Sequence, residues 1–221
     1  MNVKPLLAEF IGTFALIYAG VGAIAANDLT GGALGLTGIA LAHGLAIAVM
    51  ASATGAVSGG HLNPAVSFGL TLAGRMTPGT MIQYWAAQCL GAAAAAACVR
   101  LTFAAPTLAN VHMGVPAPGD GVGAAQVLVA EIVTTFFLVF VVFGTAVDKR
   151  APKMAGLFIG LTVALDILAI GPISGAAMNP ARHLGPALLG GGLSHTWLYW
   201  LGPLVGGGLA ALVYARGLEE R

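Results

Sequence analysis

Two copies of the tripeptide Asn-Pro-Ala are the residues of this chain whose types and spacing are best suited to chemistry. The first lies in "SGGHLNPAVSFG" at positions 58–69, and the second lies in "ISGAAMNPARHLG" at positions 173–185. Asparagine caps helix starts, and proline suits a first helical position because its missing N–H needs no partner there. The motifs therefore predict helices that start at Asn63 and Asn179. Their first turns contain Pro64, Ala65, Pro180 and Ala181.

A pair of such helix starts would select solutes by charge. Each start carries a partial positive charge of about half an elementary unit. If the two starts face each other, they oppose the passage of a cation or a proton. The side-chain amides of Asn63 and Asn179 can still donate hydrogen bonds to the oxygen atom of a neutral solute. The motifs thus indicate a site for small neutral molecules.

The composition of the chain indicates an integral membrane protein. Of its 221 residues, 58% are hydrophobic and only 8% are charged, and the mean hydropathy is +0.91. Soluble domains have about a quarter charged residues. A formal net charge of +1 provides no basic surface for nucleic acid. We therefore expect a lipid bilayer around the protein and no nucleic-acid partner.

The apolar segments fall into two length classes. A membrane-crossing helix needs about 20 apolar residues. Two shorter segments, at about 63–73 and 179–189, begin at the motifs and are predicted to be re-entrant half-helices. The predicted fold class is an all-α membrane protein with six transmembrane helices. These six segments lie at about 6–26, 34–54, 81–104, 123–146, 154–172 and 196–216.

An internal repeat relates the two halves of the chain. Besides the two motifs, "AEFIGTF" at 8–14 matches "AEIVTTF" at 130–136. Repeats at about 5–104 and 123–216, joined by an outer loop at 105–122, would make one channel domain over 1–221. Each repeat has three spans, and an odd number inverts the second copy in the membrane. The two half-helices are therefore expected to meet at mid-membrane from opposite sides.

The basic residues predict the orientation. If both termini are cytoplasmic, seven of the nine Lys and Arg residues lie on the cytoplasmic side, as the positive-inside rule requires. We expect the plasma (inner) membrane as the location. The seven are Lys4, Arg75, Lys149, Arg150, Lys153, Arg216 and Arg221.

These features resemble the aquaporin or major intrinsic protein family. The resemblance rests on two Asn-Pro-Ala motifs, the second extended to Asn-Pro-Ala-Arg, in six spans with Ala-Glu near the start of each half. It covers residues 5–216. It implies a passive channel for water, with half-helix dipoles and an arginine excluding protons and ions. It also implies a homotetramer with one pore per subunit, and neither a cofactor, a metal nor an enzymatic activity is expected.

The resemblance places an outer constriction at His43, Ile167, Ala176 and Arg182. This combination is similar to that of plant vacuolar-type aquaporins and ammonia-permeable relatives, so we expect ammonia or hydrogen peroxide to pass besides water. The Tyr199-Trp200 pair resembles water channels rather than glycerol channels. A glycerol or small-polyol facilitator is the main alternative. An ion-coupled transporter and a non-conducting structural membrane protein are further alternatives.

Other polar residues lie within the apolar spans. Glu9 and Glu131 hold matching places in the two repeats, and we expect them to accept hydrogen bonds from the re-entrant loops. For His61 a bracing role is favoured over a pH gate, whereas His43 could titrate near neutral pH. Asp166 could face a helix interface or the outer vestibule.

Overall fold

The structure is a computed structural model that describes residues 3–151 and 153–219. Within these residues it contains helices and no strands, and six of the helices are long and apolar enough to cross a membrane. This confirms the predicted fold class, although several helices extend beyond the predicted segments. The six are α1 (Val3–Leu29), α2 (Gly35–Ser58), α4 (Pro78–Thr102), α6 (Ala124–Val142), α7 (Ala155–Ser174) and α9 (Thr196–Gly217).

The two half-helices are α3 (Pro64–Leu72) and α8 (Pro180–Gly190). Each begins at the proline of its motif, and the asparagine before it has an extended backbone. With 9 and 11 residues, both are too short to cross a bilayer, which needs about 20 residues. They complete the inverted repeat, since α1 to α4 of the first half correspond in order to α6 to α9 of the second.

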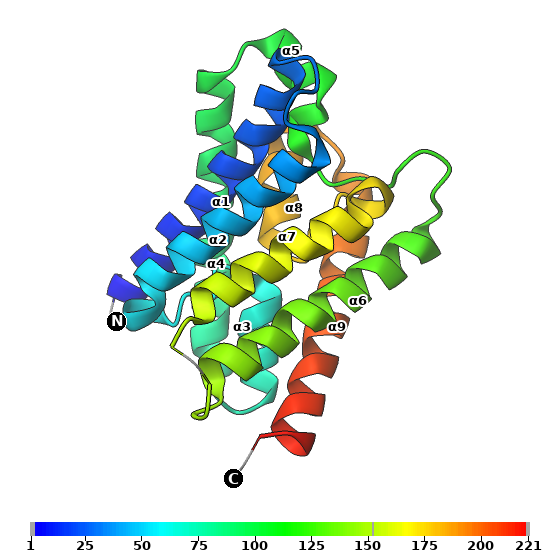
Figure 1. Ribbon diagram of the computed structural model, residues 1–221. Coiled ribbons are helices and arrows are strands. Elements are labelled where there is room, and N and C mark those ends of the chain that lie inside the picture. Colours follow the sequence, from blue (N-terminus) through cyan, green and yellow to red (C-terminus); the bar gives the residue numbers. More distant parts are fainter. Residues whose placement is uncertain (1–2, 152, 220–221) are drawn as a thin grey trace.

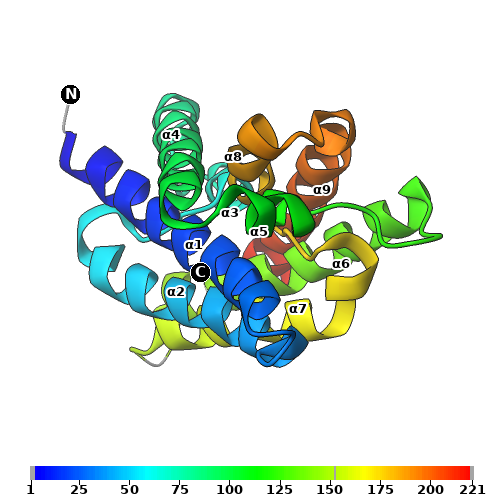
Figure 2. The ribbon, with the colours of Figure 1, turned by 90° about the horizontal axis from the view of Figure 1, so that it is seen from above.

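The long helices enclose the two half-helices. Viewed from above, α4, α1, α2, α7, α6 and α9 follow one another around the molecule (Figure 2). The helix α3 packs against α9, and α8 packs against α4. Each half-helix therefore contacts the third long helix of the other repeat, which joins the two halves into one bundle.

Glycines permit equivalent close contacts in the two repeats. A Cβ atom at Gly91 of α4 would lie 2.3 Å from the carbonyl oxygen of Phe10 in α1. At Gly206 of α9 it would lie 2.2 Å from the carbonyl oxygen of Ile132 in α6. Small residues allow the backbones of membrane helices to approach this closely. The first and third helices of each repeat are thus held together in the same way.

The connection at 105–122, which was expected to be an outer loop, contains regular structure. It begins with α5 (Ala105–Asn110) and continues with the short 3-10 helix η1 (His112–Gly114). In Figure 1, α5 lies at the end of the bundle opposite to both labelled termini. The described ends of the chain are therefore on one side, as six spans require. Arg221, one of the basic residues used for the orientation, lies outside the described residues.

Candidate functional site: a cavity at the meeting point of the half-helices

The asparagines of both motifs cap their half-helices with their side chains. The Oδ1 atom of Asn63 accepts a hydrogen bond from the backbone N–H of Ala65 at 2.8 Å. The Oδ1 atom of Asn179 accepts from the N–H groups of Ala181 at 3.0 Å and Arg182 at 3.2 Å. Both asparagines are buried. Their Oδ1 atoms accept hydrogen bonds from the first N–H groups of the half-helices, so their side-chain NH₂ groups remain available for other acceptors.

Those amide groups connect the two repeats reciprocally. Asn63 donates from Nδ2 to the carbonyl oxygen of Met178 at 2.8 Å, and Asn179 donates to the carbonyl oxygen of Leu62 at 2.9 Å. A side-chain amide has two hydrogens to donate. Each asparagine is therefore fixed by one hydrogen and has a second one available to a solute.

Glu9 is bonded to the loop that precedes α3. Its carboxylate accepts hydrogen bonds from the Ser58 hydroxyl at 2.6 Å, the His61 N–H at 3.0 Å and the Leu62 N–H at 2.6 Å. The side-chain amide of Gln88 donates a fourth bond at 2.8 Å. Leu62 is thereby held by its N–H while its carbonyl oxygen holds Asn179.

Glu131 makes the equivalent contacts in the second repeat. It accepts from the Ser174 hydroxyl at 2.7 Å, the Ala177 N–H at 2.9 Å and the Met178 N–H at 2.7 Å. Met178 has a positive φ of 49°, and its counterpart Leu62 has a φ of 52°. Non-glycine residues seldom adopt this conformation, and here a carboxylate holds each of them in it.

The hydrogen bonds that two tyrosines and two serines make in this arrangement were not predicted from the sequence. The hydroxyl of Tyr84 donates to the carbonyl oxygen of Ser58 at 2.9 Å, and that of Tyr199 donates to Ser174 at 2.7 Å. The tyrosines thus support the ends of α2 and α7. The sequence does contain a signal for these pairs. The two serines are separated by 174 minus 58, or 116 positions, and the two tyrosines by 199 minus 84, or 115 positions.

A cavity of about 240 Å³ passes the two asparagines. It brings together all six residues predicted for the pore and its selectivity, whereas Glu9 and Glu131 do not line it. Near the inner end its lining includes His61, Arg75 and Val147. Most of the remaining wall is apolar. The apolar lining residues include Leu16, Ile47, Val66, Leu70, Leu138, Val142, Ile159 and Val163, and the predicted six are His43, Asn63, Ile167, Ala176, Asn179 and Arg182.

Arg182 is held in place at the outer end of the cavity by two elements, α2 and η1. Its Nε donates to Nε2 of His43 at 3.2 Å, and its Nη1 donates to the carbonyl oxygen of Gly114 in η1 at 2.9 Å. His43 in turn contacts the Ile39 carbonyl oxygen through Nδ1 at 2.8 Å. These bonds assign the neutral tautomer with the hydrogen on Nδ1, so the ring accepts from Arg182.

Gly114 was missed by sequence reasoning because it acts through its backbone carbonyl, which every residue type possesses.

Ala176 occupies a predicted place but has an unusual backbone conformation. Its φ is 44°, and its counterpart in the first repeat is Gly60 with a φ of 63°. The methyl group of Ala176 is therefore retained in a conformation that favours glycine. Its methyl group has no equivalent at Gly60 in the first repeat.

Two further polar residues lie beside the cavity or behind its wall. His61 lines the cavity, its N–H bonds to Glu9, and its Nδ1 lies 3.0 Å from the Ser67 hydroxyl. Asp166 is 2% exposed and is not among the lining residues. The structure therefore favours the helix-interface alternative for Asp166 over the outer vestibule.

An α-helical bundle with two inverted half-helices, whose capping asparagines flank one narrow cavity, defines a transmembrane channel. The sequence model of the family described as major intrinsic protein matches residues 1–214, and the chain belongs to this family. This confirms the resemblance seen in the sequence.

The relatives found in the comparisons include two plant proteins. The chain is 50% identical to Aquaporin TIP4-4 of Zea mays, over 96% of this chain and 85% of the relative. It is 47% identical to Aquaporin TIP2-3 of Arabidopsis thaliana, over 96% and 86% of the two chains. Among solved structures, the aquaglyceroporin from Plasmodium falciparum is similar, with a TM-score of 0.89 and 25% identity over 98% of this chain and 96% of that chain.

Proposed function

We propose that this protein is a passive channel for water that also passes small neutral solutes such as ammonia or hydrogen peroxide. The observation that carries the proposal is the cavity past both capping asparagines, whose wall is apolar except at a few fixed polar groups. An apolar wall binds water weakly, so water can leave as readily as it enters. The free amide hydrogens of Asn63 and Asn179 orient each molecule as it passes.

Cations and protons are excluded by fixed positive charge at two depths. The starts of α3 and α8 present partial positive charges at the asparagines. Arg182 adds a full charge that deprotonation does not remove at physiological pH, and two acceptors outside its own helix hold its side chain. The channel therefore conducts neutral molecules without an ion or proton current.

The outer constriction consists of His43, Ile167, Ala176 and Arg182. His43 and Arg182 contribute the polar side, while Ile167 and Ala176 contribute an apolar side. Ile167 stands where strict water channels usually have a histidine, so this side of the constriction lacks a second imidazole. We expect the opening to be wider as a result and to admit solutes slightly larger than water. Because both ring nitrogens of His43 already have partners, His43 serves in its neutral form.

Glu9 and Glu131 act as braces for the re-entrant loops. Each accepts the N–H of the residue whose carbonyl oxygen holds the asparagine of the other repeat. The half-helix starts at Pro64, Ala65, Pro180 and Ala181 depend on this alignment. The braces thereby set the distance between the two asparagines.

The protein is an integral membrane protein, and we assign both described ends of the chain to the cytoplasmic side because Arg75 and Arg150 lie at that end of the bundle, in contact with Glu219 and Leu218. We propose a homotetramer, which native mass spectrometry tests as four copies of a 22.0 kDa chain. The expected plasma-membrane location receives no support from the comparisons. We therefore propose only an integral membrane location.

Stopped-flow light scattering of proteoliposomes tests this function. Under a sucrose gradient we expect faster shrinkage than in empty liposomes, with slow re-swelling under a glycerol gradient. The variant Arg182→Val should raise glycerol and urea permeability and weaken proton exclusion, because it removes the charge and widens the constriction. Shrinkage no faster than in empty liposomes would refute the channel, and ionic currents that scale with protein would favour a transporter.

A glycerol facilitator is a second candidate because the chain is similar, at 25% identity, to the solved structure of the aquaglyceroporin from Plasmodium falciparum. The same experiment separates the two candidates. Fast glycerol re-swelling without fast osmotic shrinkage would favour the facilitator. The apolar side formed by Ile167 and Ala176 is the feature to which such a result would be assigned.

A further inference from the structure

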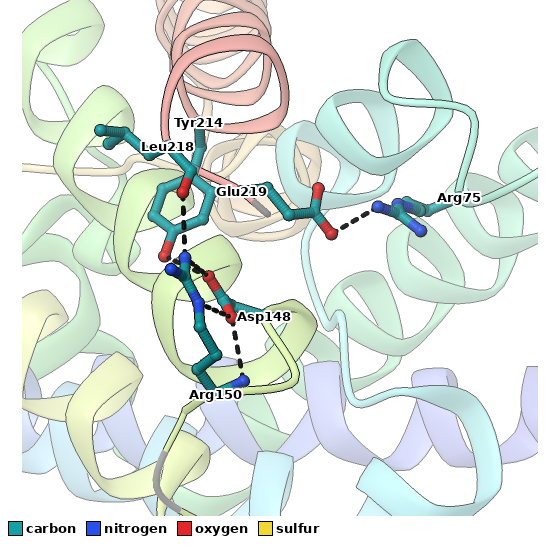
Figure 3. A network of polar contacts seen from close by, with 6 residues as sticks. All are labelled: Arg75, Asp148, Arg150, Tyr214, Leu218 and Glu219. Carbon is teal, nitrogen blue, oxygen red and sulfur yellow. Dashed lines mark hydrogen bonds and ion pairs between the residues drawn. The ribbon is translucent and has the colours of Figure 1, made fainter. Parts of the chain in front are cut away.

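The described C-terminal end of the chain is bonded to a residue that lines the inner end of the cavity. Arg75, in the connection between α3 and α4, lines the cavity and forms an ion pair with Glu219, which follows α9. The Glu219 side chain is 14% exposed, whereas that of Arg75 is 49% exposed. Figure 3 shows the Glu219 carboxylate extended toward the Arg75 guanidinium. The acid is thus the more enclosed partner.

The residue before Glu219 is bonded to the connection that follows the π-helical turn η2 (Phe143–Val147). Arg150 donates from Nη2 to the carbonyl oxygen of Leu218 at 2.9 Å. Arg150 also bonds both carboxylate oxygens of Asp148, at 2.9 Å from Nε and 2.6 Å from Nη2. The Tyr214 hydroxyl of α9 donates to Asp148 at 3.1 Å (Figure 3). These contacts attach the end of α9 to the connection between η2 and α7 (Ala155–Ser174).

The Asp148 cluster is a permanent anchor. Hydrogen bonds from the Arg150 guanidinium hold the pKa of the Asp148 carboxyl well below its usual range. Asp148 therefore stays charged, and the cluster stays formed, at any physiological pH. Among the described residues, the ion pair of Glu219 with Arg75 is not joined to a comparable network of hydrogen bonds, and its arginine side chain is 49% exposed. Of the two sets of contacts at this end of the molecule, the ion pair of Glu219 with Arg75 is therefore the one that can open.

We propose that Glu219 is a positioning residue of the inner mouth, which holds the Arg75 guanidinium at the edge of the cavity and out of the path of the solute. This inference rests on the proposed channel function. Arginine is long and remains charged, so without a partner its side chain can turn into the mouth. There it would occupy part of the opening and bind anions, since guanidinium groups form paired hydrogen bonds with phosphate.

The size of the effect follows from the exposure of the pair. Surface ion pairs are weak, and losing one changes the ratio of held to released conformations by at most about five-fold. Replacing Glu219 with glutamine should therefore lower water permeability measurably, by at most about five-fold, and leave the channel folded. The reduction should deepen in phosphate buffer, where the released guanidinium retains an anion.

The test compares wild type with E219Q, with the double variant R75Q/E219Q and with R216Q in proteoliposomes, each assayed in phosphate-free and in phosphate buffer. Arg216 is an exposed basic residue in the last turn of α9 and lines no part of the cavity. R216Q controls for the loss of a charge at this end. We expect low permeability and phosphate sensitivity only in E219Q, and recovery in the double variant because the obstructing side chain is gone.

Two results would overturn the inference while wild type conducts water. One is E219Q with the permeability of wild type in both buffers. The other is a double variant as slow as E219Q, since that pattern indicates a purely structural loss at the C-terminal end. If proteoliposomes with the wild-type protein shrink no faster than empty liposomes, the proposed channel function itself fails. The same experiment therefore separates failure of the channel function from failure of the inference about Glu219.

Discussion

Replacing Glu131 with glutamine is expected to destabilise the protein and slow water transport together. One carboxylate oxygen of Glu131 accepts from the Ser174 hydroxyl and the Ala177 N–H, and the other accepts from the Met178 N–H. A glutamine carbonyl can keep the first two bonds. Its NH₂ group then faces the Met178 N–H, so one buried donor loses its acceptor.

A buried donor without a partner costs about 1–3 kcal/mol. For a domain of this size, each kcal/mol lowers the melting temperature by about 2–4 °C, so we expect a decrease of about 2–12 °C. Water permeability should fall as well, because the Met178 carbonyl oxygen positions Asn63. Tryptophan fluorescence during heating in detergent measures the first effect, and stopped-flow light scattering measures the second.

Glu9→Gln provides a matched test in the first repeat. Its amide would leave the Leu62 N–H unpaired, but Gln88 has a side-chain oxygen without a partner among the described residues and can turn it toward the new NH₂ group. The two variants should therefore lose similar stability. Asp120→Asn, in the exposed outer connection, is the control that should change nothing. A melting temperature of Glu131→Gln equal to that of wild type would refute the bracing argument.

Three further outcomes are expected. Asp148→Asn should lower the melting temperature at pH 7, and its difference from wild type should begin to shrink below about pH 4. A carboxyl with a lowered pKa contributes its full stability above its usual pKa and loses it progressively as the pH falls toward the lowered pKa; a difference independent of pH would contradict this. Ala176→Gly should relieve about 1 kcal/mol of backbone strain and raise glycerol permeability in the stopped-flow assay, and an unchanged glycerol rate would argue against its place in the constriction. Gly20→Ala would put a methyl group 2.3 Å from Nε2 of His43, so the ring must shift from Arg182, and water permeability should fall several-fold; wild-type rates would show that the ring has room to adapt.

Local sequence rules predicted most of the fold. Asn63 and Asn179 signalled their half-helices because capping and the missing N–H of the following proline act within one turn. The alignment of the repeats likewise related Leu62 to Met178, which share their unusual backbone conformation. The helix at 105–110 was missed although it has a proline in its first turn, the same type of signal, because its six residues are too few for apolar periodicity.

The repeat pattern predicted that Glu9 and Glu131 bond to the re-entrant loops, but other contacts between distant segments could not be derived from the sequence. The bond from Arg182 to Gly114 and the bonds from the asparagines to Leu62 and Met178 all end on backbone carbonyl oxygens. Such acceptors carry no residue identity, so only the folded arrangement selects them. The sequence predicted six of the side chains that line the cavity and left open which backbone oxygens hold the asparagines and Arg182 in place.

The reciprocal asparagine bonds have a consequence for how the protein is made. Residue 178, whose carbonyl oxygen Asn63 requires, is 115 positions further along the chain. During synthesis from the N-terminus the first re-entrant loop must therefore wait, with one amide unsatisfied, until the second loop has entered the bilayer. A polar group without a partner in hydrocarbon costs several kcal/mol. The first half-helix is thus synthesised early but receives its last hydrogen bond only when the second repeat is in place. A truncated chain that ends before the second motif would lack the carbonyl oxygen that Asn63 requires.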